Sequence, residues 1–185
     1  MIAVGFRVKS GFAVAVALEG PASAPSAVSR SVIAMSDPDE PESRQPYHDG
    51  FYKTEEDSRE IARRVKIVER WANQSVAALL KKTRVARAGL IVGSVIDPQK
   101  VGNPHIRAHA HEGRLFRTVL EEALRSRGVD CHVIVEKQLA AKTAAGLHRP
   151  PGEIRRTLDR FGKALGSPWR ADEKAAATAA WLSLQ

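Results

Sequence analysis

The chain has 185 residues, 43% of them hydrophobic, and this composition favours one domain with a single sizeable core over residues 1–185. No apolar run approaches the roughly 20 residues of a bilayer span, and the lone Cys131 excludes an internal disulfide, so we expect a cytoplasmic protein without a membrane segment. The formal net charge of +8 attracts polyanions, which makes nucleic acid a candidate partner.

The first 35 residues predict three antiparallel strands. Alternating apolar side chains over residues 2–8, turn residues at 9–11 and an apolar run over 12–18 describe a β-hairpin. Val28, Val32 and Ile33 mark a third strand. Residues 36–50 then contain three prolines and five acids with almost nothing apolar, which predicts a mobile acidic loop.

A long amphipathic helix is predicted after this loop. Its apolar stripe recurs at three- and four-residue spacing and consists of Ile61, Val65, Val68, Ala72, Val76 and Leu79. The basic residues Arg63, Arg64, Lys66 and Arg70 lie largely off this stripe. We therefore expect them on the solvated face of the helix.

The second half of the sequence alternates strands and helices. Residues 88–96 form a continuous apolar run, typical of a central strand covered on both faces, and residues 129–135 predict another strand. Between them an amphipathic helix is expected to stop at Gly128. Residues 138–170 predict a helical insertion, and Asp172 is expected to cap a final Ala-rich helix that can approach a sheet closely.

Four short blocks of sequence bear on the fold. They are Gly5-Phe6-Arg7 with Gly11-Phe12-Ala13-Val14, Leu90-Ile91-Val92-Gly93 ahead of Asp97-Pro98, Val135-Glu136-Lys137, and Asp172 with Ala175 and Ala176. The order of elements resembles the RNase H fold, an α/β fold with a mixed five-stranded sheet. Within that superfamily, the blocks are similar to the YqgF or RuvX group, which comprises RuvC-like homologues of Holliday junction resolvases linked to pre-ribosomal RNA processing.

The resemblance implies a site of three acids that hold a divalent metal ion for phosphodiester cleavage. Glu136 and Asp172 match the second and third acids, and they would be the catalytic residues and metal ligands of an active enzyme. Arg7 stands where the first acid is expected. An arginine cannot ligate a cation and its charge opposes one, so Arg7 paired with Glu136 or Asp172 would make a salt-bridged cleft without metal.

Two further groups of residues are candidates for binding. Arg155, Arg156, Arg160 and Lys163 share a predicted helix face and could grip phosphates, or they could form an ordinary charged face with Glu153 and Asp159. His105 and His109 share a helix face, as metal ligands can, but His111 does not. Because no matching Cys/His cluster appears elsewhere in the sequence, a polar helix start is favoured over a metal site.

The preferred hypothesis is a divergent RuvC-like and YqgF-like protein that binds structured nucleic acid and is a degraded enzyme without a cofactor. One alternative is a nuclease that uses Mg²⁺ or Mn²⁺, with Asp97, Asp130 or Glu173 replacing the missing ligand. Another is a non-catalytic protein-interaction module that uses the long helix and the acidic loop. Paired helix faces could also support a homodimer.

Overall fold

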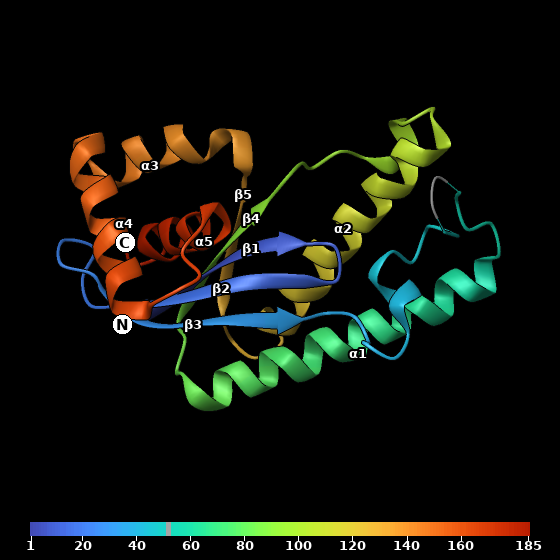
Figure 1. Cartoon of the computed structure of the whole chain (residues 1–185), viewed down its shortest axis with the longest axis horizontal. Helices are drawn as coiled ribbons and strands as arrows, with labels where there is room; N and C mark the ends of the chain where they lie inside the picture. Colours follow the sequence, from blue (N-terminus) through green and yellow to red (C-terminus); the bar gives the residue numbers. More distant parts are fainter. Residues whose placement is uncertain (51–52) are drawn as a thin grey trace.

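The computed structural model describes residues 1–50 and 53–185 and contains one five-stranded sheet in the order β3-β2-β1-β4-β5 (Figure 1). The strands are β1 (Ile2–Lys9), β2 (Phe12–Glu19), β3 (Ser26–Ala34), β4 (Arg87–Val92) and β5 (Asp130–Val135). The α-helices are α1 (Ser58–Lys82), α2 (Pro104–Arg125), α3 (Leu139–Leu147), α4 (Pro151–Leu165) and α5 (Ala171–Leu182). Short 3-10 helices, η1 (Pro41–Arg44), η2 (Pro98–Lys100) and η3 (Glu136–Gln138), lie in the connections.

The sheet has the mixed direction expected from the sequence. β1 pairs antiparallel with β2, and β2 pairs antiparallel with β3. β4 runs parallel to β1, and β5 runs parallel to β4. The carboxyl ends of β1, β4 and β5 therefore meet at one edge of the sheet.

Helices cover both faces of the sheet (Figure 1). α1 and α2 pack on one face around a core that includes Phe6, Met35, Phe116 and Leu120. α5 lies on the other face, with α3 and α4 outside it, and Trp181 is fully buried there. This arrangement brings the start of α5 to the same sheet edge as the ends of β1 and β5.

Glycines in the sheet allow α5 to approach unusually closely. A Cβ atom on Gly5 would lie 1.8 Å from the carbonyl oxygen of Ala176, and one on Gly89 would lie 2.9 Å from that of Ala179. Only glycine fits at these two crossings, and the alanines opposite keep the helix surface flat. The predicted close approach of the Ala-rich helix is thereby confirmed.

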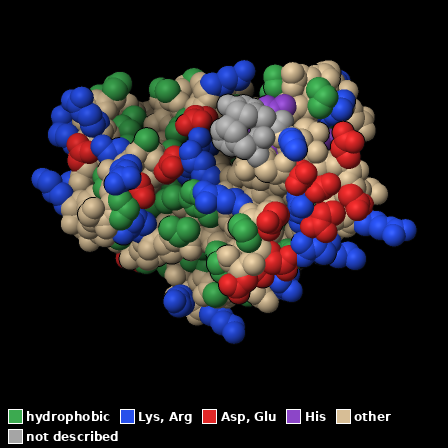
Figure 2. Space-filling model, turned by 45° about the vertical axis from the view of Figure 1, so that its right-hand side comes forward, with side chains coloured by type: hydrophobic (Ala, Val, Ile, Leu, Met, Phe, Trp, Pro, Cys, Tyr) green, Lys and Arg blue, Asp and Glu red, His purple; other side chains and the backbone are tan. Residues whose placement is uncertain are grey.

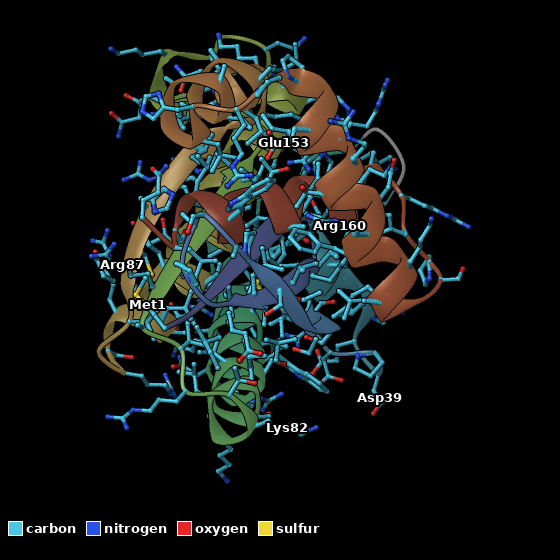
Figure 3. All side chains as sticks on the ribbon, turned by 90° about the vertical axis from the view of Figure 1, so that its left-hand side faces the viewer. Met1, Asp39, Lys82, Arg87, Glu153 and Arg160 are labelled. Carbon is cyan, nitrogen blue, oxygen red and sulfur yellow. The ribbon has the colours of Figure 1, made fainter. Side chains whose placement is uncertain are left out.

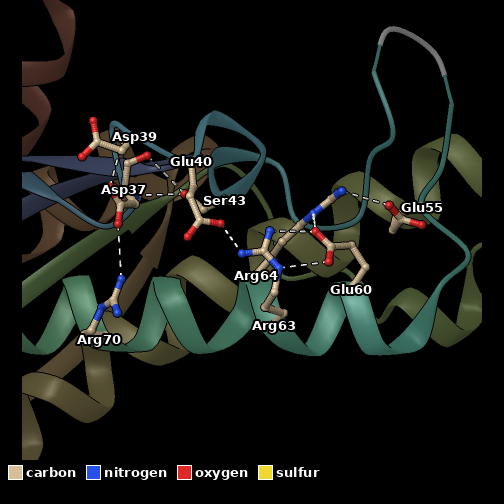
Figure 4. Close-up of polar contacts among 9 residues, drawn as sticks. All are labelled: Asp37, Asp39, Glu40, Ser43, Glu55, Glu60, Arg63, Arg64 and Arg70. Carbon is tan, nitrogen blue, oxygen red and sulfur yellow. Dashed lines mark hydrogen bonds and ion pairs between the residues drawn. The ribbon is translucent and has the colours of Figure 1, made fainter.

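Several local predictions differ from the structure. β4 ends at Val92 rather than at residue 96, and Val95 and Ile96 are exposed after it. Arg64 was predicted on the solvated face of α1 but is buried, because it ion-pairs with Glu55 and Glu60 (Figure 4). Burial of an arginine is tolerated when its charge is matched in this way.

The segment of residues 36–50 contains η1 and buries Ser43 and His48, although few of its side chains are apolar. Asp37 forms an ion pair with Arg70, and Glu40 forms one with Arg63. The segment is therefore attached to α1 through charged groups (Figure 4). Its mobility stays a prediction, as does the interpretation of residues 138–170 as an insertion. No described helix is long and apolar enough to cross a membrane.

Candidate functional site

The ends of β1, β5 and α5 bring Arg7, Glu136 and Asp172 together. Arg7 Nη2 donates a hydrogen bond to Glu136 Oε2 at 2.6 Å. Arg7 Nε lies 3.5 Å from Asp172 Oδ1, an ionic contact without hydrogen-bond geometry. The pairing that the sequence suggested for Arg7 is therefore present, and it involves both acids.

Charge at this cluster is balanced by two basic side chains from the same strand. Lys9 Nζ lies 3.2 Å from the same Oδ1 of Asp172 that Arg7 approaches. Arg7 is buried while Glu136 and Asp172 are partly exposed. The guanidinium therefore lies between the two carboxylates on their protein-facing side. Two positive charges face two negative ones, which leaves no net negative charge to attract Mg²⁺.

The two carboxylates are positioned differently by their elements. Glu136 is the first residue of η3, directly after β5. Asp172 lies in the first turn of α5, where the helix dipole favours a negative charge. The sequence predicts Asp172 as the cap of this helix, and this prediction is wrong. Glu173 instead accepts the backbone N–H of Arg170 at 2.8 Å. Asp172 is consequently free to contact Arg7 and Lys9.

The acids considered as substitutes for the missing ligand lie elsewhere. Asp130 begins β5 and so lies a whole strand, about 20 Å, from Glu136. Asp97 is exposed and caps η2 by accepting the N–H of Gln99. Glu173 is buried and committed to the start of α5. None of the three is placed to complete a ligand set with Glu136 and Asp172.

An open cleft lies beside the Arg7 cluster. Residues from β1, from the end of β4 and from α2 line it: Arg7, Lys9, Gly93, Ser94, His109 and Phe116. Its floor is basic, and its polar groups suit an anionic group better than an apolar ligand. A phosphate in this cleft would meet Arg7 and Lys9 together.

The basic residues predicted on one helix face are all exposed on α4, which lies at the outside of the molecule (Figure 3). Arg160 donates to Thr157, while Glu153 and Asp159 pair with Arg149 and Lys174 respectively. The acids of α4 thus have partners outside the basic group, consisting of Arg155, Arg156, Arg160 and Lys163. On another face, acidic and basic side chains interleave without a uniform basic patch (Figure 2).

A second cluster on α2 combines His105 and His109 with His48. His111 stacks on Tyr47 with ring centroids 4.7 Å apart and is not part of this group, as its different helix face predicted. The buried Glu112 carboxylate contacts His48, and burial raises the pKa of Glu112 while the hydrogen bond with His48 opposes that rise. Sequence reasoning missed His48 because it lies 57 residues before His105 in an acidic segment.

The fold is a RuvC-like RNase H fold, as comparison with solved structures shows. The RuvC structure from Thermus thermophilus matches 98% of this chain and 92% of its own, with a TM-score of 0.59 and 12% identity. The same protein in complex with a Holliday junction substrate gives a TM-score of 0.59 and covers 98% of this chain and 91% of its own, at 12% identity. The yeast mitochondrial Holliday junction resolvase gives 0.53 at 9% identity, over 98% of this chain and 78% of its own. No protein-family model and no curated protein sequence matches the chain.

Proposed function

We propose that this protein binds structured nucleic acid and that its Arg7, Glu136 and Asp172 cluster does not carry out metal-dependent cleavage. The observation that carries the proposal is the hydrogen bond of 2.6 Å between Arg7 and Glu136. A fixed positive charge occupies the position between the two acids. It can bind a phosphate, but it opposes a metal ion at the same place.

Two further observations support nucleic-acid binding. The fold is similar to that of a resolvase solved with a Holliday junction substrate. The chain carries 29 basic against 21 acidic residues, and the exposed basic residues of α4 could contact a backbone outside the cleft. Backbone contact rather than base readout is expected, because only 5% of the residues are aromatic.

The test compares a four-way junction with linear duplexes of the same sequence by fluorescence anisotropy at several salt concentrations. We expect tighter binding to the junction and a decrease in affinity with salt. No cleavage product is expected with Mg²⁺ or Mn²⁺. Metal-dependent cleavage that Asp172→Ala abolishes would overturn the non-catalytic part of the proposal. Failure to bind both DNA junctions and RNA junctions would overturn the nucleic-acid-binding part.

A matched pair of variants locates the contact. Alanine at Arg155, Arg156, Arg160 and Lys163 removes four charges from α4, whereas alanine at Arg59, Lys66, Lys81 and Lys82 removes four exposed charges from α1. If α4 contacts phosphates, the first variant reduces the slope of log affinity against log salt by up to about 3.6. The second changes it little. Equal effects of the two variants would reject α4 as a contact surface.

A further inference from the structure

Three imidazole rings converge between α2 and the segment before α1. His105 and His109 lie one helical turn apart, and their ring centroids are 4.6 Å apart. His48 packs against both, with centroid distances of 5.1 Å to His105 and 4.5 Å to His109. His48 is held in place by an antiparallel β-bridge to Thr54 and by Arg64, whose Nη1 donates to the His48 carbonyl at 2.8 Å.

The ring nitrogens of these histidines are spaced for a metal ion. Nε2 of His105 and Nε2 of His109 are 3.2 Å apart, and one nitrogen from each of the three rings lies within 4.8 Å of the others. Two nitrogens bound tetrahedrally to Zn²⁺ at about 2.1 Å are separated by about 3.4 Å. The pair on α2 is close to this spacing, and the third ring needs a shift of about 1.4 Å to reach it.

His48 supplies the observation that points to a ligand. Its side chain is 4% exposed, and its Nε2 has no hydrogen-bond partner among residues 1–50 and 53–185. A buried polar nitrogen without a partner is costly, and groups of this kind are rare in folded proteins. A metal ion in contact with the three rings would satisfy this nitrogen.

Glu112 orients two of the rings toward a common point. Its Oε1 lies 2.7 Å from His48 Nδ1, and its Oε2 lies 3.5 Å from His109 Nδ1. Donation of the His48 Nδ1–H to this carboxylate leaves a lone pair on His48 Nε2, while the His109 contact is within ionic range and has no hydrogen-bond geometry. Metal-bound histidines commonly donate their second nitrogen to a carboxylate in this manner.

The charges around the cluster also favour a cation. Glu112 contributes a negative charge and is only 1% exposed, so water does not screen it. The nearby Arg64 is compensated by Glu55 and Glu60, to which it pairs at 3.0 and 2.9 Å. A divalent ion would therefore meet three neutral ligands and one buried carboxylate.

We propose that His48, His105 and His109 bind a divalent transition-metal ion, with Zn²⁺ as the expected occupant and Glu112 as the residue that positions the rings. Imidazole ligands suit Zn²⁺, Co²⁺ and Ni²⁺, whereas Mg²⁺ prefers oxygen. The His109 side chain is 49% exposed, so solvent can reach one side of the cluster. Histidine side chains reach the surface in the space-filling view (Figure 2).

The test is a Co²⁺ titration of the full chain, purified without a polyhistidine tag and followed by visible absorbance, with Zn²⁺ competing for the bound Co²⁺. We expect one Co²⁺ per chain with a tetrahedral spectrum, displaced by one equivalent of Zn²⁺. His105→Ala and His109→Ala each weaken Zn²⁺ binding by at least about 100-fold, and Glu112→Gln by about 10 to 100-fold. His105 is only partly buried and His109 is exposed, so the two alanine variants are expected to fold.

His111→Ala is the matched control, because His111 lies on the same helix outside the cluster and should leave Zn²⁺ affinity unchanged. His48→Ala is read together with circular dichroism, which shows whether the variant folds. Absence of saturable binding to the wild-type chain, or binding that His105→Ala and His109→Ala leave unchanged, would overturn the proposal. These measurements contain no nucleic acid, so their result is separate from that of the proposed function.

Discussion

Two clusters near the same cleft differ in how their charges are arranged. In the Arg7 cluster, two carboxylates meet two basic side chains from β1, and the place between the acids is filled by a guanidinium. In the histidine cluster, one buried carboxylate contacts two of the rings, and a buried ring nitrogen has no hydrogen-bond partner within the described residues. His109 lines the cleft that Arg7 and Lys9 also line.

The difference suggests a test of whether this fold position decides where a cation binds. The sheet edge brings Glu136 and Asp172 together, yet Arg7 and Lys9 together balance their two negative charges. Metal affinity is instead proposed on α2, where nitrogen ligands and an unbalanced carboxylate coincide. Substitutions that alter one cluster without the other test this contrast directly.

The largest effect is expected from a substitution where α5 crosses β1 at Gly5, because this crossing positions Asp172 at the sheet edge. Gly5→Val puts a branched side chain where even a Cβ would lie 1.8 Å from Ala176 O and 2.4 Å from Ala180 N. We expect loss of more than about 3 kcal/mol of unfolding free energy, measured by urea denaturation. Gly113→Ala on α2 is the control, since nothing lies within 4 Å of its Cβ and the helix should gain about 0.5 to 1 kcal/mol.

A conversion of the Arg7 cluster should create a metal site there. In a His109→Ala background, Arg7→Asp places a third acid beside Glu136 and Asp172, so we expect a loss of about 3 kcal/mol without metal, from repulsion and a lost ion pair. Mn²⁺ at 100 times its dissociation constant should return about 2.7 kcal/mol. Calorimetric titration and thermal unfolding measure both changes.

Arg7→Met is the control for this conversion, because it removes the cation without adding a ligand. It should bind Mn²⁺ more weakly than Arg7→Asp. Equal titration heats for the two variants would reject the assignment of Arg7 to the position of the lost first acid.

Substitution of the buried Arg64 of α1 tests whether this residue holds His48 in place. Arg64→Met leaves Glu55 and the His48 carbonyl without their partner, and we expect about 3 kcal/mol of destabilisation together with weaker Zn²⁺ binding. Arg63→Met removes an exposed arginine that pairs with Glu40 and Glu60, and should destabilise the fold much less because solvent screens these pairs. Similar losses from the two variants would contradict a supporting role for Arg64.

The sequence predicts the fold and the Arg7 cluster because both follow from local patterns. Strand alternation, the apolar run of β4 and the small residues of α5 each indicate their element, and parallel strand ends must share an edge. Glu136 follows β5 and Asp172 begins α5, so their meeting with Arg7 could be anticipated from topology. The predicted roles of these residues in binding or catalysis stay predictions.

The histidine cluster could not be predicted in the same way. His48 comes from a segment whose composition indicates a loop, and its contact with His105 depends on where that segment lies against α2. The sequence predicts Arg64 on the solvated face of α1 for a related reason. A helical pattern counts arginine as polar and contains no information about acids that reach it from another segment.

The smallest effect is expected from Cys131, the single cysteine of the chain, whose thiolate transition metals favour. Burial raises the pKa of its thiol to about 11, so the metal-binding thiolate is scarce near neutral pH. Because the folded-state pKa is raised, the thiol's contribution to stability is complete below pH 9 and is lost as the pH rises toward 11. Cys131→Ala should leave the Zn²⁺ affinity unchanged, and the native wild-type thiol should react slowly with iodoacetamide at pH 8. A Zn²⁺ affinity that decreases with Cys131→Ala would place metal at β5 and remove the contrast between the two clusters.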